Sequence, residues 1–113
     1  MEQTSLEQYT NNYQQLILSQ KTVVLSTVTE KGKAESSYAP YVRDEAGVFY
    51  IFVSELASHT KNMLQNQQAS ILFIQAETEA KNLFARERVV FDCSINEVEK
   101  QDECYYKQML IMQ

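Results

Sequence analysis

The sequence has 113 residues, of which 44% are hydrophobic and 22% charged, and its formal net charge is −5. This length suits one domain and is too short for two, so we expect a single domain over residues 1–113. An acidic chain without a basic block does not suit counterion-release binding, and we expect no nucleic-acid partner. The longest apolar run, Val48–Val53, is far shorter than a membrane span, so we expect no membrane partner.

The N-terminal residues and the cysteines indicate the compartment. Residues 1–20 are polar and lack the apolar stretch of an export signal. Without such a signal, Cys93 and Cys104 are expected to be reduced thiols. Neither cysteine belongs to a CxxC motif with accompanying histidines, so we expect no metal site. We therefore expect a cytoplasmic protein.

Hydrophobic periodicity predicts a helix, three strands, a second helix, two strands and a final helix. The first helix, residues 1–20, is amphipathic, with apolar side chains at helical spacing between glutamines and asparagines. Gly32, Gly47 and Pro40 mark turns or breaks between strands. The predicted strands are 22–29, 34–42, 48–53, 70–75 and 88–98, all within a barrel segment 22–98 that also contains the helix 55–66.

The last segment, residues 99–113, has a helical pattern, with Cys104, Gln108 and Met112 along one side. The predicted helix stops at Gln113 without a capping signal or a polar tail. We expect from this stop that the chain is truncated at its C-terminus, or that a partner completes its barrel.

The order of the elements predicts the fold class. Short hairpins dominate and no βαβ alternation is present, which disfavours a doubly wound parallel sheet. Antiparallel strands with few open edges favour a closed or half-closed barrel. A domain this small exposes much of its surface, so a partner subunit would help to cover its apolar faces.

The start of the second helix contains the most informative candidate site. A helix N-terminus attracts anions through its free backbone N–H groups and its dipole. Here Ser58 and Thr60 add hydroxyl donors, Lys61 adds a cation, and His59 is the only histidine of the chain. These residues are suited to a phosphate. In the alternative interpretation, Ser54 or Ser58 is a plain helix cap and His59 is solvated or hydrogen-bonded.

Arg86 and Arg88 form a second candidate site. The two arginines lie two residues apart at the start of a predicted strand, where regular geometry gives them the same direction. Two guanidinium groups on one face could hold a phosphate or a carboxylate. The alternative is a surface pair bonded to Glu87 or to other carboxylates.

A third candidate is the segment 36–41, SSYAPY. Small residues beside tyrosines, with a proline that interrupts strand pairing, could leave backbone groups free for a planar ligand. The alternative is an edge strand with exposed tyrosines. No Ser-His-Asp pattern, carboxylate pair, GxGxxG or Walker A motif is present, so no catalytic residue is identified.

Four segments together carry a resemblance to a known family. They are Val24–Tyr41 (VLSTVTEKGKAESSYAPY), Val53–Leu64 (VSELASHTKNML), Ala69–Ile74 (ASILFI) and Leu83–Phe91 (LFARERVVF). In this order and spacing they resemble the HugZ/HutZ haem-utilisation group of the pyridoxamine 5'-phosphate oxidase-like superfamily. The resemblance covers roughly residues 16–98.

The resemblance implies a mainly β fold with flanking helices. This is the FMN-binding split barrel, antiparallel, six-stranded and of Greek-key type, which forms a homodimer with the cofactor at the subunit interface. The helix after the third strand would supply the phosphate site, and Ser37, Tyr38 and Ala39 would meet the ring system. The implied cofactor-binding residues are Ser37, Tyr38, Ala39, Ser58, His59, Thr60, Lys61, Arg86 and Arg88.

Three functions agree with these observations. The main prediction is an FMN-binding protein, similar to flavin-dependent oxidoreductases, and the phosphate-type helix start favours it. The first alternative is a haem-binding or haem-degrading utilisation protein, which the motifs favour. In haem-degrading members a histidine near the C-terminus ligates iron, and this sequence has no histidine there, which opposes this alternative. The only histidine is His59, whose place at a helix start suits phosphate better than iron. The second alternative is a cofactor-free dimeric module. The oxidases carry an Arg-Lys pair where this chain has His59–Thr60, and this difference allows such a module.

Overall fold

The computed structural model describes residues 11–12, 14–54, 56–97 and 106–112. Within this part of the chain, residues 11–12 and 14–19 are helical and precede the barrel. Two short 3-10 turns, Glu77–Glu79 and Leu83–Ala85, separate the fourth and fifth strands. The remaining elements are β1 Thr22–Val28, β2 Ala34–Arg43, β3 Phe49–Ser54, α2 Ser58–Asn66, β4 Gln68–Ile74, β5 Arg88–Glu97 and β6 Tyr106–Met112.

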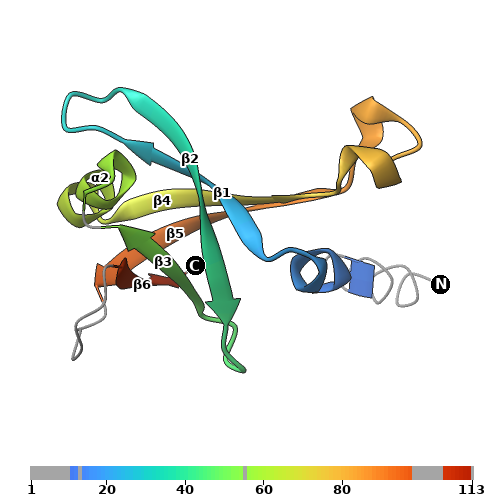
Figure 1. Cartoon of the computed structure of the whole chain (residues 1–113), viewed down its shortest axis with the longest axis horizontal. Coiled ribbons are helices and arrows are strands. Elements are labelled where there is room, and N and C mark those ends of the chain that lie inside the picture. The colour runs from blue at the N-terminus through green and yellow to red at the C-terminus, as the bar shows by residue number, and fades with distance from the viewer. Residues whose placement is uncertain (1–10, 13, 55, 98–105, 113) are drawn as a thin grey trace.

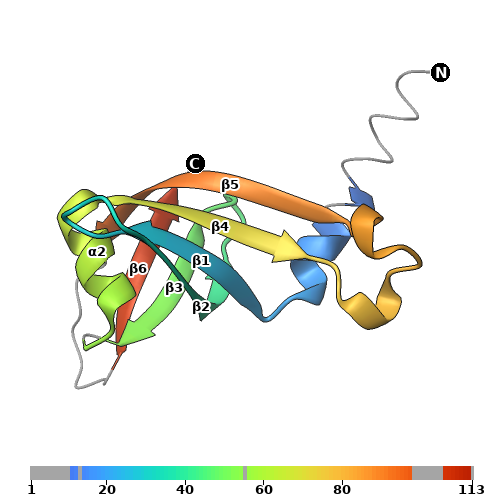
Figure 2. The ribbon, with the colours of Figure 1, turned by 90° about the horizontal axis from the view of Figure 1, so that it is seen from above.

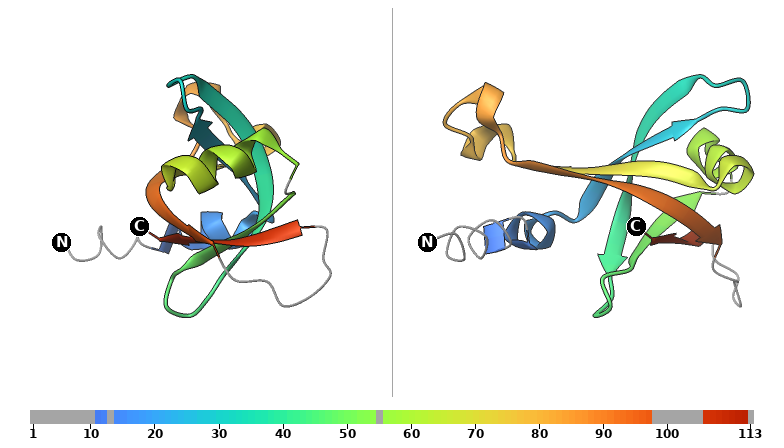
Figure 3. Two further views of the ribbon diagram at one scale, coloured as in Figure 1. Left: turned by 90° about the vertical axis from the view of Figure 1, so that its left-hand side faces the viewer. Right: turned by 180° about the vertical axis from the view of Figure 1, so that it is seen from behind.

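The six strands form one closed antiparallel ring in the order β1-β2-β3-β6-β5-β4 (Figure 1). The first three strands form a meander. The chain then crosses one end of the barrel through α2, and β4 returns to pair with β1 (Figure 3, left). The predicted mainly β split barrel with flanking helices is therefore confirmed.

The barrel interior holds the core, because alternate residues of each strand point inward. In β1 the inward positions are Val23, Leu25 and Thr27, each at most 3% exposed. Tyr41, Phe49, Phe73 and Phe91 form an aromatic cluster, with ring centroids 5.1–6.1 Å apart in the contacting pairs. The Tyr41 hydroxyl donates to the Ile17 carbonyl and ties the N-terminal helix to the barrel.

The predicted C-terminal helix over residues 99–113 is wrong for residues 106–112, which form strand β6. This strand pairs with β3 over six positions and with β5 over four, and so closes the ring. The hydrogen bonds to two neighbouring strands outweigh a helical pattern that is weak in a short segment. Residues 99–105 and 113 lie outside the described residues.

The second helix begins later than predicted. Its first helical residue is Ser58 and its N-cap is Ala57, whereas the expected range began at residue 55, which lies outside the described residues. Strand β4 begins at Gln68, two residues before the predicted start. Among the described residues, no helix is both long and apolar enough to cross a membrane.

Candidate functional site

A crevice lies where the start of α2 meets β2 and β3. Its volume is about 560 Å³, within the range of small-molecule sites. We call it the His59 crevice. Its lining residues are Tyr38, Pro40, Phe52, Val53, Ser54 and His59. Four of these six side chains, those of Tyr38, Pro40, Phe52 and Val53, are largely apolar, so the crevice suits the face of a flat, largely apolar molecule.

His59 is the titratable group of the crevice. Its Nδ1 lies 2.8 Å from the Ser37 Oγ, which in turn lies 3.5 Å from the Leu25 carbonyl oxygen. If Ser37 donates to that carbonyl, Nδ1 carries the ring proton and Nε2 keeps a free lone pair. Nε2 is buried and has no hydrogen-bond partner among the described residues. Desolvation lowers the pKa of His59, so the imidazole is neutral at physiological pH.

The four residues predicted to bind a phosphate at the start of α2, Ser58–Lys61, do not point to one common site. Thr60 is completely buried, and its hydroxyl donates to the Ser54 carbonyl at 2.5 Å, away from solvent. Ser58 and Lys61 are exposed. Neither Ser54 nor Ser58 is the N-cap residue, because Ala57 holds that position without a side-chain hydrogen bond.

The three predicted residues of β2 divide between the two faces of the strand. Ser37 is half-buried and bonds His59, whereas Tyr38 is 69% exposed and lines the crevice. Ala39 is only 2% exposed and belongs to the barrel core. Its side chain therefore cannot reach a ligand in the crevice, and only its backbone could do so.

Arg86 and Arg88 do not share a face. Arg86 lies outside β5 as the cap of a 3-10 turn, where its guanidinium donates to the Gln75 carbonyl at 2.6 and 2.8 Å. It also lies 3.9 Å from the Glu77 carboxylate. Arg88 is the first residue of β5, is exposed, and pairs with Ile74. The alternation that predicted a common direction applies only within a strand.

Within one chain, the arginines are far from the His59 crevice. Arg88 begins β5 and pairs with Ile74 of β4, whereas the crevice is lined by β2, β3 and the start of α2. Strands β1 and β4 lie between β2, which lines the crevice, and β5, so three inter-strand spacings of about 4.8 Å separate Arg88 from β2 across the sheet. The structure thus brings Ser37, Tyr38 and His59 together and leaves Arg86 and Arg88 apart from them.

Asn62 anchors the helix that carries His59, and the sequence analysis did not select it. Its Nδ2 donates to the Thr27 Oγ1 at 3.0 Å and to the Glu35 Oε1 at 2.7 Å. Its side chain is only 7% exposed, so these bonds tie α2 to β1 and β2 inside the protein. The sequence signal that could have identified Asn62 is its position three residues after His59, which places both residues on the same face of the helix.

The strand register aligns two rows of side chains across the outside of β2, β1, β4 and β5. The polar row consists of Ser36, Ser26, Ser70 and Asp92. The apolar row, two residues further along each strand, consists of Tyr38, Val24, Leu72 and Val90.

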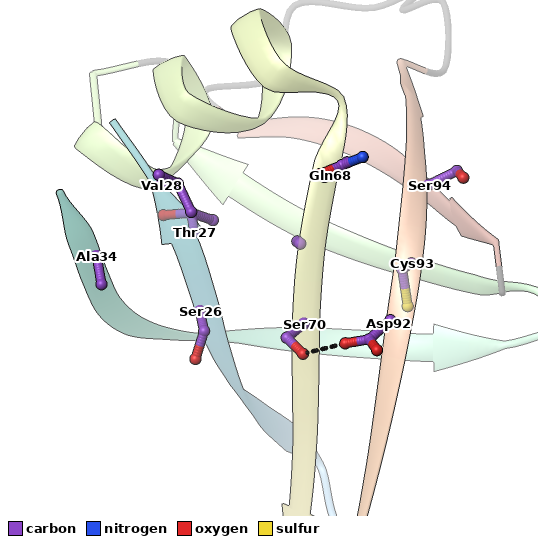
Figure 4. Close-up of a pocket in the computed structure, with 10 residues that line it drawn as sticks. Ser26, Thr27, Val28, Ala34, Gln68, Ser70, Asp92, Cys93 and Ser94 are labelled. Carbon is purple, nitrogen blue, oxygen red and sulfur yellow. Dashed lines mark hydrogen bonds between the residues drawn. The ribbon is translucent and has the colours of Figure 1, made fainter. Parts of the chain in front are cut away.

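The polar row and the apolar row therefore form two neighbouring surfaces of different polarity on the outside of the sheet. Part of the polar row lines a second hollow of about 530 Å³, where the Ser70 hydroxyl donates to the Asp92 carboxylate at 2.8 Å (Figure 4). In the apolar row, Tyr38 is 69%, Val90 55% and Val24 37% exposed. The described residues contain no group of three or more His, Cys, Asp or Glu side chains that could hold a metal ion.

The closed six-strand ring, with a crossing helix whose start borders a crevice, defines the chain as a split-barrel protein. Residues 9–110 match the model of the pyridoxamine 5'-phosphate oxidase family. The chain belongs to this family, and within it to the HugZ/HutZ-like group.

The similar proteins support this grouping. The haem oxygenase HutZ of Vibrio cholerae is 42% identical over 85 residues, which are 75% of this chain and 48% of that protein. The chain thus spans about half the length of this curated relative. A crystal structure of HutZ from Vibrio cholerae, described as a haem storage protein, has a TM-score of 0.82 at 29% identity and covers 90% of this chain and 87% of that chain. The fold is also shared with Campylobacter jejuni ChuZ, with a TM-score of 0.81 at 22% identity over 97% of this chain and 54% of that chain.

Proposed function

We propose that this chain is a haem-binding protein of the haem-utilisation type, which works as a cytoplasmic homodimer with the cofactor at the subunit interface. The similarity to a relative named as a haem oxygenase, at 42% identity, supports haem over the flavin of the wider family. The buried Cys93 is a free thiol, as expected in a reducing compartment.

The observation that carries this proposal is the buried Nε2 of His59, at the wall of an apolar crevice and without a hydrogen-bond partner among the described residues. A neutral imidazole with a free nitrogen is the form that binds iron. The Nε2 of His59 has that form when Ser37 accepts the Nδ1 proton. Nε2 is covered in this structure, so a bound metal would reach it only after the crevice wall moves.

Haem would supply a redox-active iron that binds oxygen, and the described residues would bind and orient it. The exposed Tyr38 and the half-exposed Phe52 offer ring faces to a flat macrocycle. The hydrogen bond between the His59 Nδ1 and the Ser37 Oγ fixes the direction of the imidazole.

FMN is the second candidate, and the start of α2 favours it. Its N-cap has no side-chain hydrogen bond, and the exposed Ser58 and Lys61 lie within the first turn. Such a helix start attracts phosphate. However, the Thr60 hydroxyl is already bonded to Ser54 and the imidazole is neutral. Both features weaken the fit of this helix start to a phosphate.

A dimer would complete the site with one of the two arginines. A two-fold axis along the seam between β1 and β4 would lay β5 of one protomer over β2 of the other, face to face. The apolar row would then be buried against its copy. Arg88 lies two residues before Val90 on the same face of β5, and Pro40 lies two residues after Tyr38 on β2. This packing would therefore bring Arg88 to the partner's crevice, where its charge suits a carboxylate of the cofactor.

Titration of the purified protein with haem and with FMN tests the proposal. We expect haem to shift its Soret band and to saturate at one per protomer, and FMN to leave its spectrum unchanged. The Arg88→Ala variant should bind haem about tenfold more weakly, equivalent to about 1.4 kcal/mol. Its melting temperature should change little, because Arg88 is exposed.

Lys31→Ala is the matched control, because it removes one exposed positive charge in the β1–β2 turn, away from the crevice. It should leave haem affinity unchanged. Equal affinity of the Arg88 variant and the wild type would make Arg88 a surface residue only. Binding of FMN without haem would favour the second candidate. Binding of neither would favour a cofactor-free dimeric module.

A further inference from the structure

The connection between β4 and β5 carries an exposed aromatic residue at its tip. We call residues 75–87 the β4–β5 arm. It extends beyond the barrel at the end opposite α2 (Figures 1 and 2). At its tip, Phe84 is 98% and Leu83 66% exposed. Two adjacent large apolar side chains on a projecting arm are more than scattered surface hydrophobics.

The arm is held in shape by its own hydrogen bonds. The backbone N–H of Gln75 donates to the Glu87 carbonyl at 2.7 Å, and the Gln75 side chain accepts from the Glu87 N–H at 3.2 Å. The Arg86 guanidinium donates two hydrogen bonds to the Gln75 carbonyl. At the tip, the Asn82 side chain accepts from the Phe84 N–H at 2.9 Å. The Phe84 ring is therefore presented to solvent by a preformed turn, which favours binding to a second surface.

We propose that Phe84 of one protomer closes the mouth of the partner's His59 crevice and covers a flat cofactor held there. This inference rests on the proposed homodimer. The occupant of the crevice mouth is a second copy of this chain, because the apolar row that the proposed dimer would bury begins at β2, which lines the crevice, and ends at β5, which follows the arm.

Two further observations support this pairing. The apolar row runs across the sheet from the strand that lines the crevice, β2, to the strand that follows the arm, β5, so one continuous apolar surface connects the two sites. The crevice mouth also offers aromatic partners, because Tyr38 is 69% and Phe52 36% exposed. Aromatic pairs prefer offset or edge-to-face contacts, which a phenyl ring from the partner can make with both side chains.

The absence of tryptophan makes a direct test possible, because the sequence has none. Phe84→Trp introduces one fluorophore at the arm tip, where a large exposed side chain does not disturb the core. We expect its emission to move to shorter wavelength as the protein concentration rises through the dimer dissociation constant. Haem should then quench this emission by energy transfer. Leu18→Trp is the control, because Leu18 is 83% exposed on the N-terminal helix and should show no concentration-dependent shift.

A second variant measures the covering role itself. Phe84→Ala should release haem about tenfold faster than the wild type, because an aromatic contact of this kind slows dissociation. If the Phe84→Trp variant is a dimer by light scattering and its emission stays that of a solvent-exposed indole, the inference is overturned and the proposed function still stands. If haem leaves the Phe84→Ala variant as slowly as the wild type, Phe84 does not cover the cofactor, and the proposed function again still stands. A protein that stays monomeric would overturn both.

Discussion

At the scale of single residues, His59 should make stability depend on pH. Its pKa in the folded protein is lowered by desolvation, below the value of about 6.5 expected in the unfolded chain. As pH falls below that value, the unfolded state takes up a proton that the folded state resists. The contribution of His59 to stability is therefore present above pH 6.5 and is lost as pH falls toward the folded pKa.

The comparison with His59→Gln isolates this effect from the carboxylates, which titrate in the same range. Denaturant unfolding at several pH values should show the wild type losing more stability than the variant between about pH 7 and pH 5. Parallel curves for the two proteins would mean that His59 is not desolvated. The same histidine would then be free to act as a cation toward phosphate.

At the scale of elements, α2 is held on the barrel by a buried polar contact. Asn62→Ala removes donors to Thr27 and to the Glu35 carboxylate, and we expect a loss of about 2–3 kcal/mol in the free energy of unfolding. Asn66→Ala is the matched control on the same helix. Its side chain is exposed and donates once, to the Val28 carbonyl, so the loss should stay below about 1 kcal/mol. Equal losses in urea unfolding would contradict the anchoring role of Asn62.

The strands that the sequence predicted well are those in which alternation is strong. In β5, Cys93 and Ile95 point inward between exposed residues, and β1 shows the same period of two. Strand β6 was missed because its pairing with β3 joins residues that are far apart in the sequence. The pattern of residues within one segment does not show which distant strand that segment pairs with.

The candidate site could be predicted only in part. Motif order located Tyr38 and His59, which do line one crevice. The role of Ser37 depended on register, since its contact with His59 joins residues 22 positions apart. Thr60 points into the protein because it lies on the buried face of α2 with Met63, where its hydroxyl donates to the Ser54 carbonyl. The separation of Arg88 from the crevice follows from the barrel topology, which the segment patterns do not contain.

At the scale of the whole molecule, the apolar row decides whether two copies assemble. Val90 is 55% exposed in the single chain, so Val90→Lys should leave the fold intact and put a charge into the proposed interface. We expect light scattering to show a dimer for the wild type and a monomer for this variant. Haem affinity should fall in parallel, because the partner's Arg88 is removed from the crevice.

Leu64→Lys provides the control for an added surface charge. Leu64 is 40% exposed on α2, outside the apolar row, so this variant should remain a dimer and keep its haem affinity. Circular dichroism of both lysine variants establishes that each is folded. If Val90→Lys stayed dimeric, the two-fold axis along the β1–β4 seam would be wrong. If it became monomeric and still bound haem as tightly as the wild type, the crevice of one chain would be sufficient by itself.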